Sequence, residues 1–199
     1  MEGFVYVWGH WRLRLLLILF AVVGIFGWSY SVMMPAFASD FLGVGARGYG
    51  ALLSANGTGA FLGALTVASL GPRVNRRLLV FGGLAVFSAM LLLLAFVKVY
   101  LFALLFLAVG GWGMLLFFST TNTLLQTNAS DEMRGRVMGI WTLVFGGMTP
   151  LGGLEAGTLS YYLGVRGAIA FGALVCAAAA LVIWLMVRRK LQAAGQQPG

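Results

Sequence analysis

The chain has 199 residues, of which 61% are hydrophobic and only 9% are charged, and its mean hydropathy is +0.96. Soluble domains carry about 25% charged residues, so this composition excludes a soluble globular protein. The single cysteine, Cys176, excludes a disulfide within the chain. With one histidine, no phosphate loop and no Cys/His cluster, the sequence predicts a protein that is not an enzyme and that needs no cofactor or metal.

Stretches long enough to cross a bilayer follow one another along the chain, since a spanning helix needs about 20 mostly apolar residues. Spans one to six are Leu13–Phe37, Tyr49–Leu70, Leu78–Val97, Leu101–Gln126, Val137–Leu163 and Ala168–Val187. Pro35 predicts a kink near the outer end of span one. We therefore predict an all-α membrane protein with a cytoplasmic interfacial segment at 1–12, a six-transmembrane-helix bundle at 13–187 and a cytoplasmic tail at 188–199.

Rows of small residues occur in spans two and five. Ala55, Gly59 and Gly63 are spaced by four and therefore share one face of a helix. Gly153 and Gly157 have the same spacing in span five. Small side chains let the backbones of neighbouring membrane helices approach closely, so both rows are predicted to be helix-packing contacts.

Lys and Arg are distributed unequally between the two ends of the spans. Ten of the 13 lie before or at the very start of span one, after span six, or in the connections between spans two and three and between spans four and five. The other connections hold Arg47, Lys98 and Arg166. Because loops rich in Lys and Arg stay in the cytoplasm, both termini are predicted to be cytoplasmic. This placement assigns the net charge of +8 to topology, and no nucleic-acid partner is expected.

Several segments resemble one branch of the major facilitator superfamily. The matching segments are EGFVYV, RLRLLL, SYSVMMPAFASDFLGVGARGYGALLSANGTGAFLGAL, NTLLQTNASDEMRGRVMGIWTL and GGMTPLGGLEAG. NTLLQ, and RGRVMG preceded by an acidic pair, are the most specific of them. The branch comprises bacterial exporters similar to the enterobactin exporter, sometimes called transmembrane secretion effectors. The resemblance covers nearly the whole chain but only the second half of such a transporter.

The resemblance implies a half of a major facilitator fold, with a possible 3+3 inverted repeat. Such transporters have two six-helix halves around a central path. The resemblance implies that this chain takes part in the export of small amphipathic molecules across the bacterial cytoplasmic (inner) membrane. Transport is expected to proceed by alternating access and to be coupled to protons. The implied partners are the lipid bilayer, a small-molecule substrate, and an N-terminal six-helix half or a second copy. Two alternatives stay open: a half-size transporter acting as a homodimer, and a non-transporting six-span scaffold or regulatory partner.

Polar and aromatic side chains inside the spans are candidates for lining the substrate path. They are Trp28, Tyr30, Asn56, Thr58, Asn122 and Gln126. In this hypothesis the aromatic rings stack on an amphipathic ligand and the amides orient it. In the alternative, the polar groups make hydrogen bonds between helices and the aromatic rings anchor the chain at the membrane interface.

Glu155 is the acid that lies well inside a predicted span. An ionisable group within a membrane is costly and usually faces a cavity or a partner, so Glu155 is the candidate for proton coupling. The alternative is a structural, hydrogen-bonding residue near the outer water boundary.

A compact charged set, made of Asp131, Glu132, Arg134 and Arg136, follows span four. In the family that the chain resembles, charged cytoplasmic loops behave like latches that favour the outward-open state. The charged set is therefore a candidate latch, and Arg73 is a further candidate for it. The alternative is that these charges set the topology and cap the next helix, where anions are favoured at the first turn.

Overall fold

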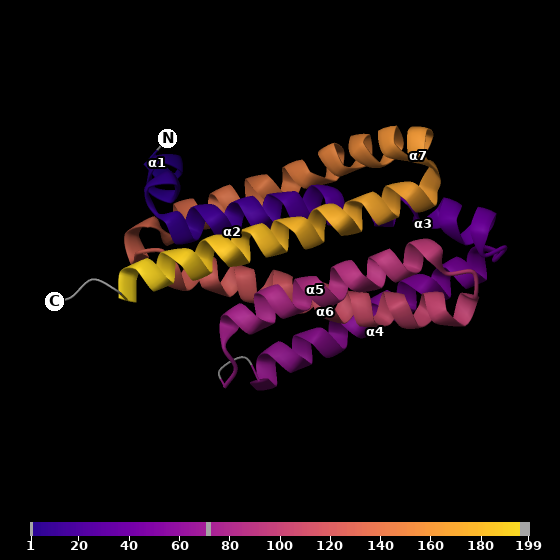
Figure 1. The fold of residues 1–199 in the computed structure, drawn as a ribbon, viewed down its shortest axis with the longest axis horizontal. Coiled ribbons are helices and arrows are strands. Elements are labelled where there is room, and N and C mark those ends of the chain that lie inside the picture. The colour runs from indigo at the N-terminus through magenta and orange to yellow at the C-terminus, as the bar shows by residue number, and fades with distance from the viewer. Residues whose placement is uncertain (1, 71–72, 196–199) are drawn as a thin grey trace.

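The structure is a computed structural model that describes residues 2–70 and 73–195, and within these ranges the chain is almost entirely helical. Its α-helices are α1 (Glu2–Gly9), α2 (Trp11–Val22), α3 (Tyr30–Ala36), α4 (Ala46–Leu70), α5 (Arg76–Phe96), α6 (Tyr100–Asn128) and α7 (Asp131–Gly195). Two π-helical turns, η1 (Val23–Gly27) and η2 (Phe37–Phe41), interrupt the first span. The helices lie side by side in one elongated bundle (Figure 1).

Helix α7 supplies two membrane crossings. Its 65 residues would extend for roughly 98 Å as one straight helix, more than three times the hydrocarbon core of about 30 Å. At Gly164 the backbone is non-helical, with φ 70° and ψ 164°, and Figure 1 shows α7 reversing its direction and returning along the bundle. Together with four further apolar spans in the described chain, the two halves of α7 make the six predicted crossings.

Both described ends of the chain, α1 and the end of α7, lie at the same end of the bundle (Figure 1). The end of α4, the start of α5, the end of α6 and the start of α7 lie toward this end as well, and together with the two termini these segments carry most of the cations. We call it the basic end. Its cytoplasmic placement stays a prediction from the charge distribution.

The first span breaks at two places. One is η2, which begins two residues after Pro35, and the other is η1, an earlier wide turn that Pro35 does not predict and where glycines meet other helices. A Cβ atom on Gly24 would lie 1.8 Å from Met148 Sδ, and one on Gly27 would lie 3.0 Å from Cys176 Sγ. The wide turn therefore presses the first span against both halves of α7. Such π-turns within helices are frequent at functional sites.

Helices α4 and α6 touch through their backbones. A Cβ atom on Gly59 would lie 1.8 Å from the carbonyl oxygen of Ala108, and one on Gly63 would lie 2.8 Å from that of Trp112. Ala55, the third member of this row, is half-buried. The small-residue row of span two thus lies against α6, and only glycine permits the approach at its centre.

The first half of α7 and much of α4 are uncovered. In α4, 17% of the most apolar stretch is buried, against 50% in α5. Several glycines along the first half of α7 face open space, because a Cβ atom added to them would have no described atom of another element within 4 Å. They are Gly135, Gly139, Gly146, Gly147, Gly153 and Gly157. The structure therefore places Gly153 and Gly157 on an open face and away from any packing contact inside this chain.

Helix α1 docks on the start of α7. The backbone N–H of Ser130 donates to Tyr6 Oη (3.1 Å), and hydrogen bonding by the Ser130 side chain and backbone lowers the pKa of the Tyr6 phenol. Arg136 forms an ion pair with Glu2. At the other terminus, α7 continues as a helix to Gly195, into the predicted tail, and the remaining residues 196–199 lie outside the described residues.

Candidate functional site

A cavity of about 130 Å³ lies where the broken first span meets α6 and the first half of α7. It is lined by Phe20, Gly24, Trp28, Met114, Phe117, Phe118, Phe145, Met148 and Thr149. Aromatic rings and methionine side chains make up most of this wall, which suits an apolar or aromatic ligand group. We call it the aromatic cavity.

The aromatic cavity leads from the core to the open face of the bundle. Phe20 and Phe117 at its inner wall are 1% and 0% exposed, whereas Trp28 and Phe145 at its outer wall are 46% and 45% exposed. The inner wall is held by packed rings, because Phe20 stacks on Trp141 with their centroids 3.5 Å apart. Of the predicted path residues, Trp28 is the one that the structure places in this cavity.

Tyr30 and Asn56 join three helices. Asn56 Nδ2 donates hydrogen bonds to Tyr30 Oη (3.1 Å) and to the carbonyl oxygen of Leu107 (3.3 Å). These bonds link α3, α4 and α6. Thr58 is exposed, and its hydroxyl donates to the carbonyl of Ser54 within α4. This geometry matches the alternative interpretation of interhelical hydrogen bonding for Asn56, and it separates Thr58 from the aromatic cavity.

Asn122 and Gln126 lie one and two turns beyond Phe118 toward the basic end of α6, and neither lines the aromatic cavity. Gln126 Nε2 donates to Asn122 Oδ1 (2.6 Å), and the backbone carbonyl of Gln126 accepts from Arg134 Nε (3.2 Å). Arg134 also pairs with Asp131 one turn earlier in α7. These residues form one polar cluster that ties the end of α6 to the start of α7.

The remaining charges of the predicted latch are not part of this cluster. Arg136 reaches Glu2 on α1, so α1 supplies a partner that the sequence did not suggest. Glu132 and Arg73 are exposed at the basic end. Three of the five charged residues therefore form ion pairs, and the other two, Glu132 and Arg73, are exposed and form no ion pair among the described residues.

Glu155 lies in the first half of α7, beside the break in the first span. Both of its carboxylate oxygens are buried, and neither has a hydrogen-bond partner among the described residues. Ser29 is its neighbour, but the Ser29 hydroxyl donates to the carbonyl of Phe26 (3.0 Å). A carboxyl group that is buried without a hydrogen-bond partner is costly.

Phe20, Phe118, Phe145 and Met148 line the cavity, and sequence reasoning did not select them. A signal was present in span five, because Phe145, Met148 and Thr149 are spaced by three and four and therefore share a helix face. No such signal marks Phe20, because the cavity forms between helices that are distant in the sequence.

Membrane transport proteins are commonly built as bundles of membrane-crossing helices around a cavity, and the described chain has this arrangement. Residues 16–198 match the Major Facilitator Superfamily, and the chain belongs to this family. The chain is 31% identical, over 165 residues, to the enterobactin exporter EntS of Escherichia coli O1:K1 / APEC and to that of E. coli O45:K1 (strain S88 / ExPEC). The match covers 79% of this chain and 38% of each relative. No solved structure matches the chain.

Proposed function

We propose that this chain forms the C-terminal six-helix half of an exporter of small amphipathic molecules in the bacterial cytoplasmic membrane, with both termini in the cytoplasm. The observation that carries the proposal is the aromatic cavity, which opens toward a face of the bundle that the chain itself leaves uncovered. Similarity to an enterobactin exporter supports export as the direction of transport. The chain's match to only 38% of that relative supports a role as one part of the transporter.

A second six-helix bundle is the proposed cover for the open face. A glycine that faces lipid does not contribute to helix packing, whereas a glycine that faces another helix permits close contact between the two backbones. With the first half of α7 and α4 covered, the aromatic cavity would lie between two halves. Rocking of one half against the other would then open it to each side of the membrane in turn.

The charged side chains at the basic end are proposed to contribute to a latch between the halves. Glu132 and Arg73 are exposed and would meet charges of a partner, whereas Arg134 and Asp131 form an ion pair within the first turn of α7. Closing the basic end in this way would favour the state that is open on the opposite side of the membrane.

Co-expression tests the two-half arrangement. Where an upstream reading frame encodes six further spans, its product is expected to co-purify with this chain in detergent. Cells that make both polypeptides should then clear the fluorescent dye Nile red faster than cells that make either one alone. If this chain alone clears the dye and sizes as a twofold particle, the homodimer alternative replaces the proposal.

Replacing Trp28 tests the substrate path. Trp28→Ala removes a ring from the outer wall of the aromatic cavity and should weaken binding of an aromatic amphiphile by about 1 kcal/mol. The KM for dye transport should therefore rise about fivefold, with kcat little changed. Trp8→Ala, on the exposed face of α1, is the matched control and should leave KM unchanged. Equal effects of the two variants would remove Trp28 from the path.

A further inference from the structure

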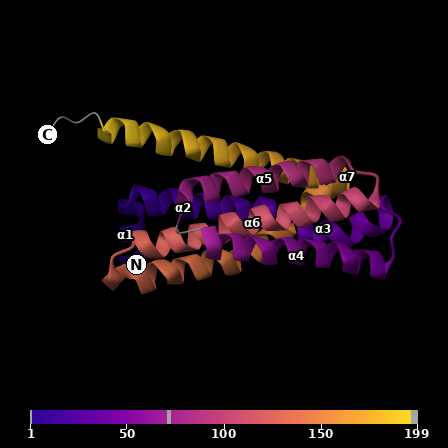
Figure 2. The same ribbon diagram turned by 90° about the horizontal axis from the view of Figure 1, so that it is seen from below.

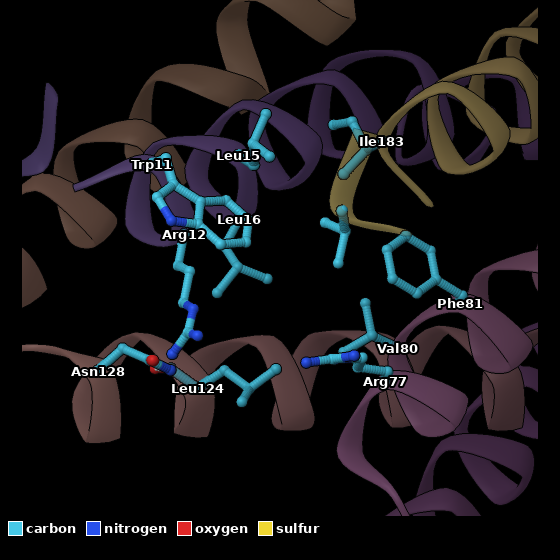
Figure 3. Close-up of a pocket in the computed structure, with 11 residues that line it drawn as sticks. Trp11, Arg12, Leu15, Leu16, Arg77, Val80, Phe81, Leu124, Asn128 and Ile183 are labelled. Carbon is cyan, nitrogen blue, oxygen red and sulfur yellow. The ribbon is translucent and has the colours of Figure 1, made fainter. Parts of the chain in front are cut away.

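Two hollows at the basic end are lined by cations on apolar walls. The first, the basic cavity, has a volume of about 200 Å³ and lies between α2, α5, α6 and the second half of α7. It is lined by Trp11, Arg12, Leu15, Leu16, Arg77, Val80, Phe81, Leu124, Asn128, Ile183 and Val187. Figure 3 shows Arg12 entering it from α2 and Arg77 from α5, with both guanidinium groups on the same side of the cavity. The second hollow, of about 350 Å³, adjoins the first through Arg77, Phe81 and Val187 and adds Arg188.

These cations have no carboxylate partner among the described residues. No Asp or Glu lines either hollow, and the two ion pairs of the described chain involve Arg134 and Arg136 instead. Aromatic rings lie beside Arg12 and Arg188 of the hollows and beside the nearby Lys190. The Arg12 guanidinium lies 5.4 Å from the centroid of the Trp11 ring, and the Lys190 ammonium lies 4.9 Å from the same ring. Arg188 lies 5.4 Å from the Trp184 ring. The hollows therefore concentrate positive charge that is positioned but not neutralised.

An apolar groove continues from the hollows toward the middle of the membrane. It lies between α5 and the second half of α7, which runs along one side of the bundle and diverges from it toward the C-terminus (Figure 2). The groove has a volume of about 450 Å³ and shares Phe81 with both hollows. Its floor is hollowed by small residues, namely Ala85, Ala89, Ala173, Ala177 and Ala180. We call it the alanine groove.

The length of the alanine groove matches one leaflet of a bilayer. From Phe81 to Leu92 the groove follows α5 for roughly 17 Å. One leaflet contributes half of the hydrocarbon core, which is about 15 Å. A molecule with its anionic group at Arg12 and Arg77 and an acyl chain along the groove would thus lie at the depth that a phospholipid occupies.

We propose that the basic cavity, its neighbouring hollow and the alanine groove form a binding site for one anionic phospholipid of the leaflet at the basic end. Its phosphate accepts hydrogen bonds from Arg12, Arg77 and Arg188, and one acyl chain occupies the groove. Charge complementarity selects this occupant, because basic pockets between membrane helices favour anionic headgroups. The lipid bridges α2, α5 and the second half of α7, and so it braces the first and last spans against each other.

Native mass spectrometry of the full chain in detergent tests the site. Phosphatidylglycerol and phosphatidylcholine with identical acyl chains are added in equal amounts. Phosphatidylglycerol is expected to be retained about tenfold better, and Arg12→Gln and Arg77→Gln should each weaken its retention about fivefold. Arg47→Gln, which removes an exposed cation at the opposite end, is the matched control and should have no effect.

A variant that changes no charge tests the groove. Ala177 is exposed, so Ala177→Leu fills the alanine groove without displacing a buried neighbour, and it should also weaken retention of phosphatidylglycerol several-fold. Circular dichroism verifies that each variant keeps the helical content of the wild type. Equal retention of the two lipids, or equal losses in Arg12→Gln and Arg47→Gln, would overturn the proposal. Displacement of the lipid by glycerol 3-phosphate alone, with no effect of Ala177→Leu, would also overturn it, since the ligand would then be a free anion.

Discussion

Adding one methyl group at Gly59 should destabilise the bundle by about 3 kcal/mol, at the upper end of what overpacking usually costs. The Cβ of Gly59→Ala would lie 1.8 Å from the carbonyl oxygen of Ala108, so α4 and α6 must separate to accept it. The free energy of unfolding is measured from the loss of helical circular dichroism during titration with a denaturing detergent.

Gly57→Ala is the control for this experiment, because it adds the same atom to the same helix. Apart from its chain neighbours and the backbone of its own helix, no atom of the described residues lies within 4 Å of a Cβ at Gly57. Replacing a helical glycine by alanine at an open position increases stability by about 0.5 to 1 kcal/mol. The two variants should therefore change stability in opposite directions. Changes of the same sign and size would show that α4 and α6 do not meet at Gly59.

Glu155→Gln should abolish the response of transport to a pH gradient in the assembled transporter. The amide has nearly the shape of the protonated carboxyl group but does not titrate. For one proton exchanged per substrate, a gradient of one pH unit supports about tenfold accumulation. In inverted membrane vesicles the wild type should approach this ratio for Nile red, whereas the variant should only equilibrate the dye.

Asp40→Asn is the matched control for Glu155→Gln. Asp40 is an exposed acid at the opposite end from the basic residues, where its carboxylate accepts a hydrogen bond from Ser39. Asp40→Asn makes the same change from carboxyl to amide at a site away from Ser29 and the break in the first span, so gradient-driven accumulation should persist. If Glu155→Gln keeps the full response to the gradient, Glu155 is a structural residue and the proton is carried elsewhere.

The crossings of this protein were predictable because lipid demands about 20 apolar residues for each spanning helix, and Arg73, Arg136 and Arg188 mark the ends of those stretches. The small-residue row at Gly59 was visible for a similar reason, since residues four apart share a helix face. The family was recognisable from NTLLQ and RGRVMG, and the match over residues 16–198 confirms it.

Features that depend on distant segments were not predictable. The first span widens at Gly24 because Met148 of α7 lies against it, and nothing within span one signals that neighbour. Glu2 pairs with Arg136 across most of the chain. Asn56 looked like a path residue because of its polarity, but its donors reach Tyr30 and Leu107 in neighbouring helices. Only the packed structure separates these roles.

Gly164 has a consequence for the two leaflets of the membrane. A chain with an even number of crossings ends in the leaflet where it began, and one with an odd number ends in the opposite leaflet. The conformation at Gly164, φ 70° and ψ 164°, belongs to a region that is essentially accessible only to glycine. It returns the last span to the starting side, where Lys190 lies beside the same Trp11 ring as Arg12. The backbone angles of this one residue thus decide that cations from the two ends of the chain meet in one leaflet.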